Sequence, residues 1–284
     1  MSLDKSPRTI HFPLRTFRLE RPVVMGILNL TPDSFYGQSR WKNVDHAILL
    51  AEKMLSEGAD IIDIGAQSTR PGAERIDAKT EEERLIPTLV MIRKEFPKSI
   101  ISVDTFYSSV AKIAFENGAD MINDVSGGTI DDKMFETAAA CRVPYVLMHI
   151  KGEPQTMQHS PTYENVLAEV KQYFAEKIDS LHQLGVNDII IDPGFGFGKT
   201  TEHNLQLMNG LDQLSIFGLP IMVGISRKKT IQNVLEVSVE NTLNGTTVLN
   251  TIALMRGARI LRVHDVREAV ETVKLVAAVE NQDL

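Results

Sequence analysis

Apolar residues along the chain form short runs, and each run ends in a polar or charged residue and precedes a stretch with helical spacing. The arrangement occurs eight times. The runs and the residues that end them are Val23–Leu28 with Asn29, Asp60–Ile62 with Asp63, Ile100–Val103 with Asp104, Ala119–Ile122 with Asn123, Pro144–Met148 with His149, Asp188–Ile191 with Asp192, Pro220–Ile225 with Ser226, and Ala258–Val263 with His264. Continuous Val, Ile and Leu runs are typical of strands buried on both faces. Eight such strands alternating with helices predict a (β/α)8 TIM barrel of the α/β class, whose strand ends meet in one mouth.

The stretches between the runs carry apolar residues at helical spacing, most clearly over Val44–Leu55, Leu167–Leu181 and Val266–Ala277. We interpret these stripes as helix faces packed on the barrel. Weak alternation over Thr9–Leu14 and Thr16–Arg21 predicts a short N-terminal hairpin that closes the barrel floor.

Two connections, Thr31–Lys42 and Gly65–Lys79, are too long to be simple turns. Long loops in compact domains are usually binding loops or lids, so we expect both to cover the mouth. The chain has no low-complexity segment, linker or change of composition. We therefore expect a single domain over residues 1–284, with the barrel proper at about residues 23–280.

The composition narrows the class of protein. Of the 284 residues 43% are hydrophobic, the formal net charge is −7, and one residue, Cys141, is a cysteine. The sequence lacks the roughly 18 consecutive apolar residues of a transmembrane helix and a basic, then apolar leader. A single cysteine excludes an intrachain disulfide and fits a reducing compartment, so we expect a cytoplasmic protein without a membrane partner. The negative charge argues against a nucleic-acid partner.

Basic residues nevertheless gather at predicted strand ends, at Arg70, Arg227–Lys229 and Arg262–His264. Most Lys and Arg residues are solvated surface charge, but three clusters at one end of a barrel concentrate positive potential there. This placement favours a small anionic substrate.

The segment Asp192–Thr200 follows a strand, is rich in glycine and ends Gly-Lys-Thr, as a phosphate-binding P-loop does. The spacing excludes that interpretation, because the first glycine of the motif would have to stand at Pro193. We interpret the glycines as a loop whose backbone approaches a flat ligand closely.

The strand-end residues permit a metal site as an alternative. Its ligands would be Asp63, Asp104, Asp192, His149 and His264. Barrel metallohydrolases typically carry His-x-His on the first strand, and here that strand ends in Asn29, which argues against a transition metal. Any one of the acids could instead cap the helix that follows it.

As a set, the strand-end residues offer two kinds of chemistry. Carboxylates and an amide suited to the donor-rich edge of a heterocycle stand at Asp104, Asn123 and Asp192. Side chains suited to phosphate oxygens stand at Arg70, Lys228, Arg262 and His264. The combination favours a ligand with both a polar heterocycle and a diphosphate.

Several local sequences resemble the signatures of the dihydropteroate synthase family. Met25–Phe35 and Ile64–Ala73 match its two signature segments. Shorter segments follow in the family's order at Ile101–Thr105, Ile122–Asp124, Asp192–Lys199, Gly224–Lys228 and Arg262–Val266. The resemblance implies a (β/α)8 transferase of folate biosynthesis that joins 6-hydroxymethyl-7,8-dihydropterin diphosphate to 4-aminobenzoate with Mg²⁺, giving 7,8-dihydropteroate and diphosphate. It also implies a homodimer and inhibition by sulfonamides.

The resemblance implies roles for individual residues. The pterin-binding positions are Asp104, Asn123, Asp192 and Lys228. The diphosphate-binding positions are Asn29, Arg70, Arg262 and His264, with Asn29 also at the Mg²⁺ site. The aminobenzoate positions are Thr69, Pro71, Phe197 and Ser226. The catalytic candidates are Lys228, Arg262 and His264, since cations around the diphosphate would stabilise the leaving group, while Asp63 and His149 receive no role.

The chain departs from the family in two places. Gly37, Gln38 and Ser39 stand where the family commonly has Asp-Gly-Gly, so Asp33 or Gln38 would have to replace an acid that steadies a cationic intermediate. Lys229 stands where many members have Ser, and it could pair with the aminobenzoate carboxylate. Two alternatives to an active synthase stay open, a barrel of folate-dependent methyl transfer and a paralogue that binds pterin without turnover.

Overall fold

A computed structural model describes residues 8–13, 15–30, 40–67, 75–152 and 161–281 of the chain. Eight strands form one parallel sheet in the order β8-β7-β6-β5-β4-β3-β10-β9. Their bounds are Val23–Asn29 (β3), Ile61–Gly65 (β4), Ile100–Asp104 (β5), Met121–Asp124 (β6), Tyr145–Met148 (β7), Ile189–Asp192 (β8), Met222–Val223 (β9) and Ile260–Val263 (β10). A parallel bridge between Ile191 and Ile221 joins the two ends of this order, so the sheet closes into a barrel.

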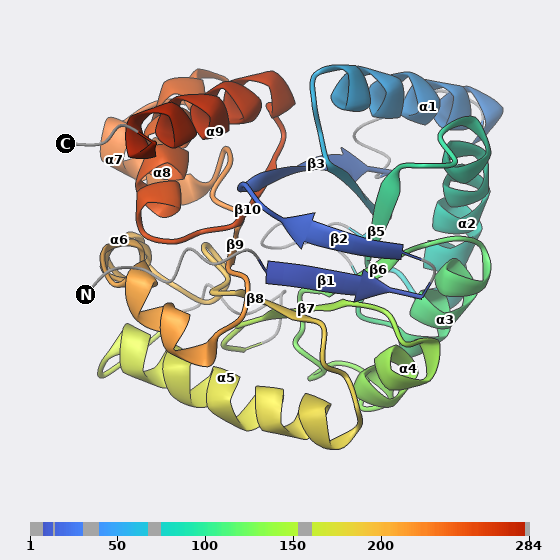
Figure 1. Cartoon of the computed structure of the whole chain (residues 1–284), viewed down its shortest axis with the longest axis horizontal. Coiled ribbons are helices and arrows are strands. Elements are labelled where there is room, and N and C mark those ends of the chain that lie inside the picture. The colour runs from blue at the N-terminus through green and yellow to red at the C-terminus, as the bar shows by residue number, and fades with distance from the viewer. Residues whose placement is uncertain (1–7, 14, 31–39, 68–74, 153–160, 282–284) are drawn as a thin grey trace.

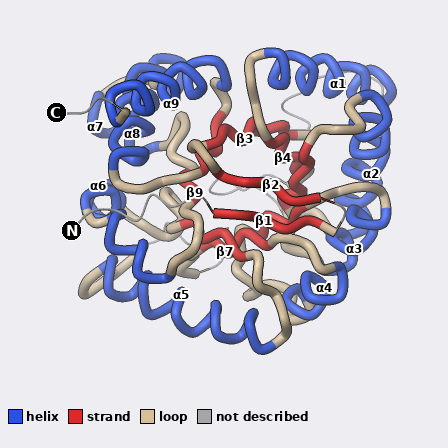
Figure 2. Tube along the Cα trace, viewed as in Figure 1, coloured by secondary structure: helices blue, strands red, loops and turns tan. Residues whose placement is uncertain are grey.

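Helices alternate with the strands and surround the barrel (Figures 1 and 2). Their bounds are Arg40–Ser56 (α1), Ala78–Glu95 (α2), Ser108–Glu116 (α3), Met134–Cys141 (α4), Val166–Gln183 (α5), Thr201–Asn209 (α6), Lys229–Leu235 (α7), Leu243–Met255 (α8) and Val266–Glu280 (α9), with short 3-10 helices at Leu211–Phe217 and Val239–Asn241. No helix in the described part of the chain is long and apolar enough to span a membrane. The predicted (β/α)8 architecture is confirmed.

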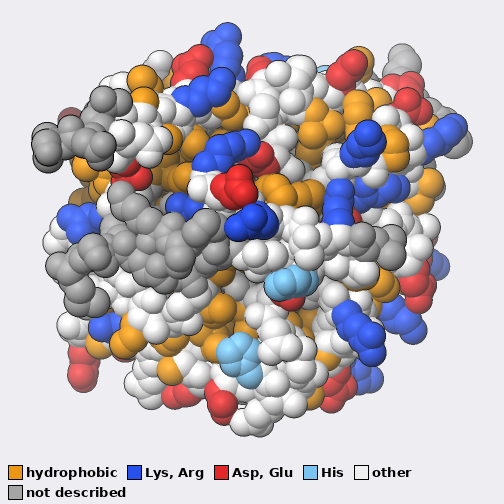
Figure 3. Space-filling model, in the orientation of Figure 1, with side chains coloured by type: hydrophobic (Ala, Val, Ile, Leu, Met, Phe, Trp, Pro, Cys, Tyr) orange, Lys and Arg blue, Asp and Glu red, His pale blue; other side chains and the backbone are white. Residues whose placement is uncertain are grey.

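The predicted N-terminal hairpin is also present. Strands β1 (Arg8–Phe12) and β2 (Arg15–Leu19) pair antiparallel and lie across the barrel opening in Figure 1. Ile10, Phe12 and Leu19 are buried against the first interior residues of the barrel strands, so the hairpin closes the floor. Acidic and basic side chains are interspersed on this face (Figure 3).

Alternation along the strands separates a dry floor from a polar mouth. Ile61, Ile100, Met121, Ile190 and Ile260 form one apolar cluster inside the barrel with the hairpin. Side chains of a strand point to the same face every second residue, so the interior positions that follow are polar. These positions are Asp63, Ser102 and Asp104, Asn123, Asp192, and Arg262.

Strand β9 is shorter than the predicted run from residue 220 to 225. Pro220 has no N–H and contributes only its carbonyl, which accepts a hydrogen bond of 3.0 Å from the Ile191 N–H. The ladder to β10 is limited to Met222 and Val223. The apolar run from residue 220 to 225 is therefore longer than the strand, because Ile221 and Ile225 are buried but lie outside β9.

Candidate active site

Arg262 links two carboxylates at the mouth of the barrel. Its Nε lies 2.7 Å from Oδ2 of Asp63, and one of its Nη atoms lies 2.6 Å from Oδ2 of Asp104. All three side chains are largely or fully buried. Charge-assisted hydrogen bonds in two directions fix the plane of the guanidinium. Arg262 and Asp104, predicted for different parts of the substrate, are thus in direct contact.

Asp63 is a residue whose importance the sequence analysis missed. Its side chain has no exposed surface, and its Oδ2 accepts hydrogen bonds from Arg262 and, at 3.0 Å, from Nδ2 of Asn123. Asp63 therefore holds a predicted pterin residue and a predicted diphosphate residue in fixed relative positions. The sequence did indicate an interior position for Asp63, because it lies two residues after Ile61 on β4 and residues two apart on a strand share a face.

Asp192 and Arg262 face a common space. A Cβ atom placed on Gly224 would lie 3.9 Å from Oδ2 of Asp192 and 3.9 Å from Cβ of Arg262. The other carboxylate oxygen of Asp192 accepts a 2.8 Å hydrogen bond from the Gly194 N–H. The loop after β8 therefore orients Asp192 towards the mouth.

Lys228 reaches the loop after β8 from the N-terminus of α7. Its Nζ donates to the carbonyl oxygen of Phe195 and lies 4.3 Å from the centre of the Phe197 ring. Gly196 between them has φ +79°, and a Cβ there would lie 3.0 Å from Cδ of Lys228. A side chain at this position would be strained and would displace the lysine.

Ser226 and His264 form a hydrogen-bonded pair. The Ser226 hydroxyl lies 3.1 Å from Nδ1 of His264 and accepts a 3.2 Å hydrogen bond from the His264 backbone N–H. Desolvation of the ring and the charges of Arg262 and Arg227 lower the pKa of His264. The imidazole is therefore neutral near pH 7 and can donate a hydrogen bond to an anion through a ring N–H.

The remaining predicted residues either make no side-chain hydrogen bond with this cluster within the described part of the chain or lie outside that part. Asn29 is half-buried at the end of β3, and Lys229 is exposed as the first residue of α7. Thr69, Arg70 and Pro71 lie outside the described residues, as do most of the two long connections and the departure at residues 37 to 39.

Burial and charge set the protonation of the polar mouth. Burial raises the pKa values of Asp104 and Asp192, although Arg262 opposes this at Asp104 and Lys228 opposes it at Asp192. Burial also lowers the pKa of Lys228 to about 8, against the attraction of Asp192. Acids and cations are thus interdependent here, which is common where a protein binds a charged ligand.

Comparison with known proteins identifies the family. A family model described as "Pterin binding enzyme" matches residues 25–264. The dihydropteroate synthase of Escherichia coli (strain K12) is 42% identical over 262 residues, which cover 92% of this chain and 92% of that protein. The chain belongs to the dihydropteroate synthase family.

Solved structures of family members agree with this fold. A Yersinia pestis dihydropteroate synthase in a sulfonamide drug complex has a TM-score of 0.91 and 39% identity, covering 97% of this chain and 100% of that one. A Xanthomonas albilineans dihydropteroate synthase with 4-aminobenzoic acid has a TM-score of 0.90 and 36% identity, covering 98% and 100%. The chain is a transferase of folate biosynthesis that condenses 6-hydroxymethyl-7,8-dihydropterin diphosphate with 4-aminobenzoate to 7,8-dihydropteroate and diphosphate, as predicted from the sequence.

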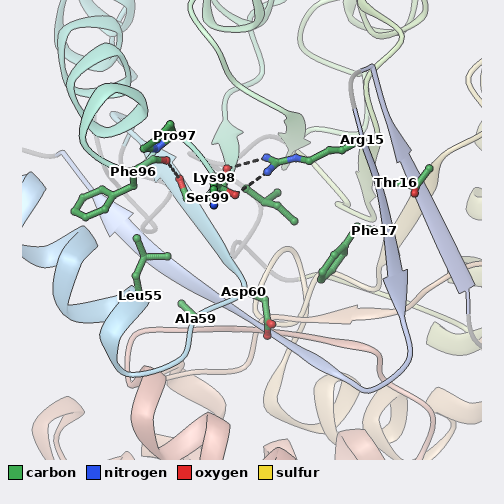
Figure 4. Close-up of a pocket in the computed structure, with 11 residues that line it drawn as sticks. Arg15, Thr16, Phe17, Leu55, Ala59, Asp60, Phe96, Pro97, Lys98 and Ser99 are labelled. Atoms are coloured by element: carbon green, nitrogen blue, oxygen red, sulfur yellow. Dashed lines mark hydrogen bonds between the residues drawn. The ribbon is translucent and has the colours of Figure 1, made fainter.

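Besides the mouth, two other kinds of site could serve a function: a metal site made of acidic, histidine or cysteine side chains, and a cavity away from the mouth. In the described part of the chain, no three His, Cys, Asp or Glu residues form a cluster that could hold a metal ion. A cavity of about 580 Å³ lies at the opposite end of the barrel, lined by Arg15, Phe17, Asp60, Phe96 and neighbouring residues (Figure 4). Arg15 donates there to the carbonyl oxygens of Lys98 and Ser99. Its lining includes Asp60 and Ser99, which directly precede β4 and β5, so the cavity is separate from the polar mouth at the other end of these strands.

The buried pair His149 and Lys199 was also given no role by the sequence analysis. Nζ of Lys199 lies 2.8 Å from Nδ1 of His149, and both residues are at most 4% exposed. Burial lowers the pKa of Lys199 to about 7 and, with the Lys199 charge, lowers the pKa of His149. The Gly-Lys-Thr sequence suggests a nucleotide motif, but its lysine is buried within the protein and hydrogen-bonded to His149.

Proposed function

We propose that Asp104, Asn123, Asp192 and Lys228 bind the pterin of the diphosphate substrate. The supporting observation is the continuous set of hydrogen bonds from Asn123 through Asp63 and Arg262 to Asp104, which joins residues of different strands at one mouth. A carboxylate facing an amino-pyrimidinone edge accepts paired, charge-assisted hydrogen bonds and disfavours rings without those donors.

Replacement of one pterin acid tests this assignment. Asp192→Asn keeps the shape of the side chain but replaces one acceptor oxygen by a donor, so the dissociation constant for the pterin substrate should rise at least about tenfold. Asp188→Asn is the matched control, because Asp188 precedes the same strand and binds His11 at the floor. Calorimetry with 6-hydroxymethyl-7,8-dihydropterin measures both, and equal affinities would refute the pocket.

Arg262, His264, Asn29 and Arg70 would bind the diphosphate. Nε and Nη2 of Arg262 are engaged by Asp63 and Asp104, so among the bonds within the described part of the chain Nη1 is the nitrogen left to approach a phosphate oxygen. His264 is held by Ser226 at the same mouth. Arg262 and His264 would stabilise the charge that builds on the diphosphate as the carbon–oxygen bond breaks.

Asn29 would hold Mg²⁺ through its side-chain oxygen. Mg²⁺ prefers oxygen ligands and is often bound by one or two protein groups together with substrate phosphates, so a half-buried amide at a strand end fits. Bound there, Mg²⁺ would neutralise charge on the diphosphate.

The aminobenzoate would lie near Phe197 and Ser226, with Thr69 and Pro71 on the covering loop. Phe197 is 7% exposed and offers an aromatic surface beside the ammonium of Lys228. Diphosphate leaves the pterin methylene carbon, the aminobenzoate nitrogen then attacks the methylene cation, and the nitrogen loses a proton. Since relatives bind 4-aminobenzoic acid or a sulfonamide drug, we expect sulfonamides to compete at this position.

A homodimer through the late helices is proposed because apolar side chains are exposed there. Val234 on α7, Met255 on α8 and Leu275 on α9 are 54%, 61% and 69% exposed. Helix α8 packs against both α7 and α9, which suits a shared surface. Sedimentation should give twice the 31.6 kDa chain mass, and a monomer at micromolar concentration would contradict this.

The lone Cys141 supports a cytoplasmic location.

A further inference from the structure

Lys199 lies at the centre of the loop that follows β8. Its Nζ is within 3.0 Å of the carbonyl oxygens of Gly194 and Phe197 and within 3.4 Å of that of His149, in addition to Nδ1 of His149. The side chain is 3% exposed. Carbonyl oxygens carry partial negative charge, so several of them pointing at one ammonium resemble the ligands of a bound cation.

This arrangement sets the shape of the loop. The Gly194 carbonyl accepts from Lys199 and, at 3.1 Å, from the Phe197 N–H, so the turn is closed twice. Gly194 has φ +70°, and a Cβ there would lie 1.9 Å from the His149 carbonyl oxygen. The loop therefore lies directly on the end of β7, where His149 begins the connection.

The far end of the loop is anchored separately. The Tyr163 hydroxyl donates a 2.8 Å hydrogen bond to the Gly198 carbonyl, and the Tyr163 ring lies 6.3 Å from the His149 ring. The part between these anchors carries the two groups that contact Lys228, namely the Phe195 carbonyl and the Phe197 ring. Its Gly196 N–H donates a 2.9 Å hydrogen bond to Oδ1 of Asn204. The buried ammonium thus controls a segment that reaches the mouth.

We propose that Lys199 is a positioning residue for the aminobenzoate subsite, where its buried amino group donates to the Gly194 and Phe197 carbonyls and thereby fixes the Phe197 ring. A buried cation is costly unless several acceptors surround it, and here those acceptors belong to the segment that carries Phe197. The inference rests on the proposed position of aminobenzoate beside Phe197.

Steady-state kinetics of the purified enzyme test the proposal. Lys199→Met keeps the length of the side chain but removes the ammonium, and it should raise KM for 4-aminobenzoate about tenfold, because small displacements of a positioning group cost this much or more. KM for the pterin diphosphate should change less, because Asp104 and Asn123 are held by Asp63 and Arg262. Lys171→Met is the control, since Lys171 is half-buried on α5 and contacts only Gln213 among the bonds described. It should leave both KM values unchanged.

A double-mutant cycle distinguishes positioning from a general structural role. If Lys199 acts through Phe197, the double variant Lys199→Met with Phe197→Ala should raise KM for 4-aminobenzoate no more than Phe197→Ala alone. Additive effects would overturn the proposal. No effect of Phe197→Ala itself would show that the proposed aminobenzoate position is wrong, whereas an effect of Phe197→Ala without one of Lys199→Met would overturn only the role of Lys199.

A milder variant covers the case in which Lys199→Met fails to fold. Tyr163→Phe removes only the hydroxyl that anchors the Gly198 carbonyl. It should raise KM for 4-aminobenzoate about two- to threefold with the pterin KM unchanged, in line with the loss of one hydrogen bond. An unchanged KM for 4-aminobenzoate in this folded variant would contradict the premise that the position of this loop determines the aminobenzoate subsite.

Discussion

Asp63 and Arg262 form a 2.7 Å ion pair in which the carboxylate has no exposed surface. The same carboxylate oxygen holds Asn123, and the same guanidinium holds Asp104. Removal of Asp63 would therefore disturb a pterin residue and a diphosphate residue at once. A residue that touches no substrate in this account thus determines the geometry of those that do.

Asp63→Ala should damage both stability and activity. Asp104 still pairs with Arg262 in this variant, but Nε of Arg262 and Nδ2 of Asn123 lose their buried acceptor. The free energy of unfolding should therefore fall by about 3 kcal/mol, and kcat/KM should fall at least about tenfold. Urea unfolding and steady-state kinetics measure these. The control is Glu20→Gln, which breaks the exposed pair of Glu20 with Arg18 and should change neither quantity. A folded, fully active Asp63→Ala enzyme would refute the supporting role of Asp63.

Pterin affinity should weaken at alkaline pH because of Lys228. Burial lowers its pKa to about 8, so the ammonium loses its proton as the pH rises through that value. The dissociation constant for 6-hydroxymethyl-7,8-dihydropterin should therefore rise above pH 8 in the unaltered enzyme. Lys228→Met should bind weakly and show a smaller dependence over the same range. If the dissociation constant depends on pH equally in the unaltered enzyme and in Lys228→Met, a charged Lys228 does not contribute to pterin binding.

Glu81 should make the protein less stable as the pH rises. It is fully buried in the first turn of α2, neither carboxylate oxygen has a hydrogen-bond partner among the described residues, and burial raises its pKa from 4.5 to about 8. Between these values the folded protein retains a proton that the unfolded chain has lost, so unfolding becomes easier with rising pH. The loss should be on the order of 3 kcal/mol by pH 7.

Glu81→Gln should remove this dependence. Urea unfolding from pH 5 to 8 should show a downward slope for the unaltered enzyme and a flatter one for Glu81→Gln. Glu83→Gln, an exposed change on the same helix, should keep the slope. If Glu81→Gln keeps the full slope, Glu81 is not the group that titrates.

Lys229→Ser tests the second departure from the family. Lys229 is exposed and directly follows Lys228, so we expect it to attract the aminobenzoate carboxylate. Because exposed ion pairs contribute at most about 1 kcal/mol, KM for 4-aminobenzoate should rise only about threefold. KM for the pterin diphosphate should stay constant. An unchanged KM for 4-aminobenzoate would exclude the pairing.

Apolar runs predicted the barrel well because burial on both faces and period-two alternation act on every strand. Asp104, Asn123 and Asp192 were predicted as pterin-binding residues because each ends such a run, and the structure places all three at interior positions of the mouth. The role of Asp63 was missed because the same position also suits a helix cap, and its partners on β6 and β10 are distant in sequence. The contacts of Lys199 could not be predicted, because a Gly-Lys-Thr sequence suggests phosphate binding and only the folded loop brings the Gly194 and Phe197 carbonyls to its side chain.

The most direct test of the central claim is the release of diphosphate from 6-hydroxymethyl-7,8-dihydropterin diphosphate with and without 4-aminobenzoate. Asp192→Asn and Asp188→Asn are assayed beside the unaltered enzyme. We expect release that depends on 4-aminobenzoate, is retained in Asp188→Asn and falls by about a hundredfold in Asp192→Asn, since a buried acceptor is lost where the ring binds. Tight pterin binding without release, or full activity of Asp192→Asn, would contradict this account.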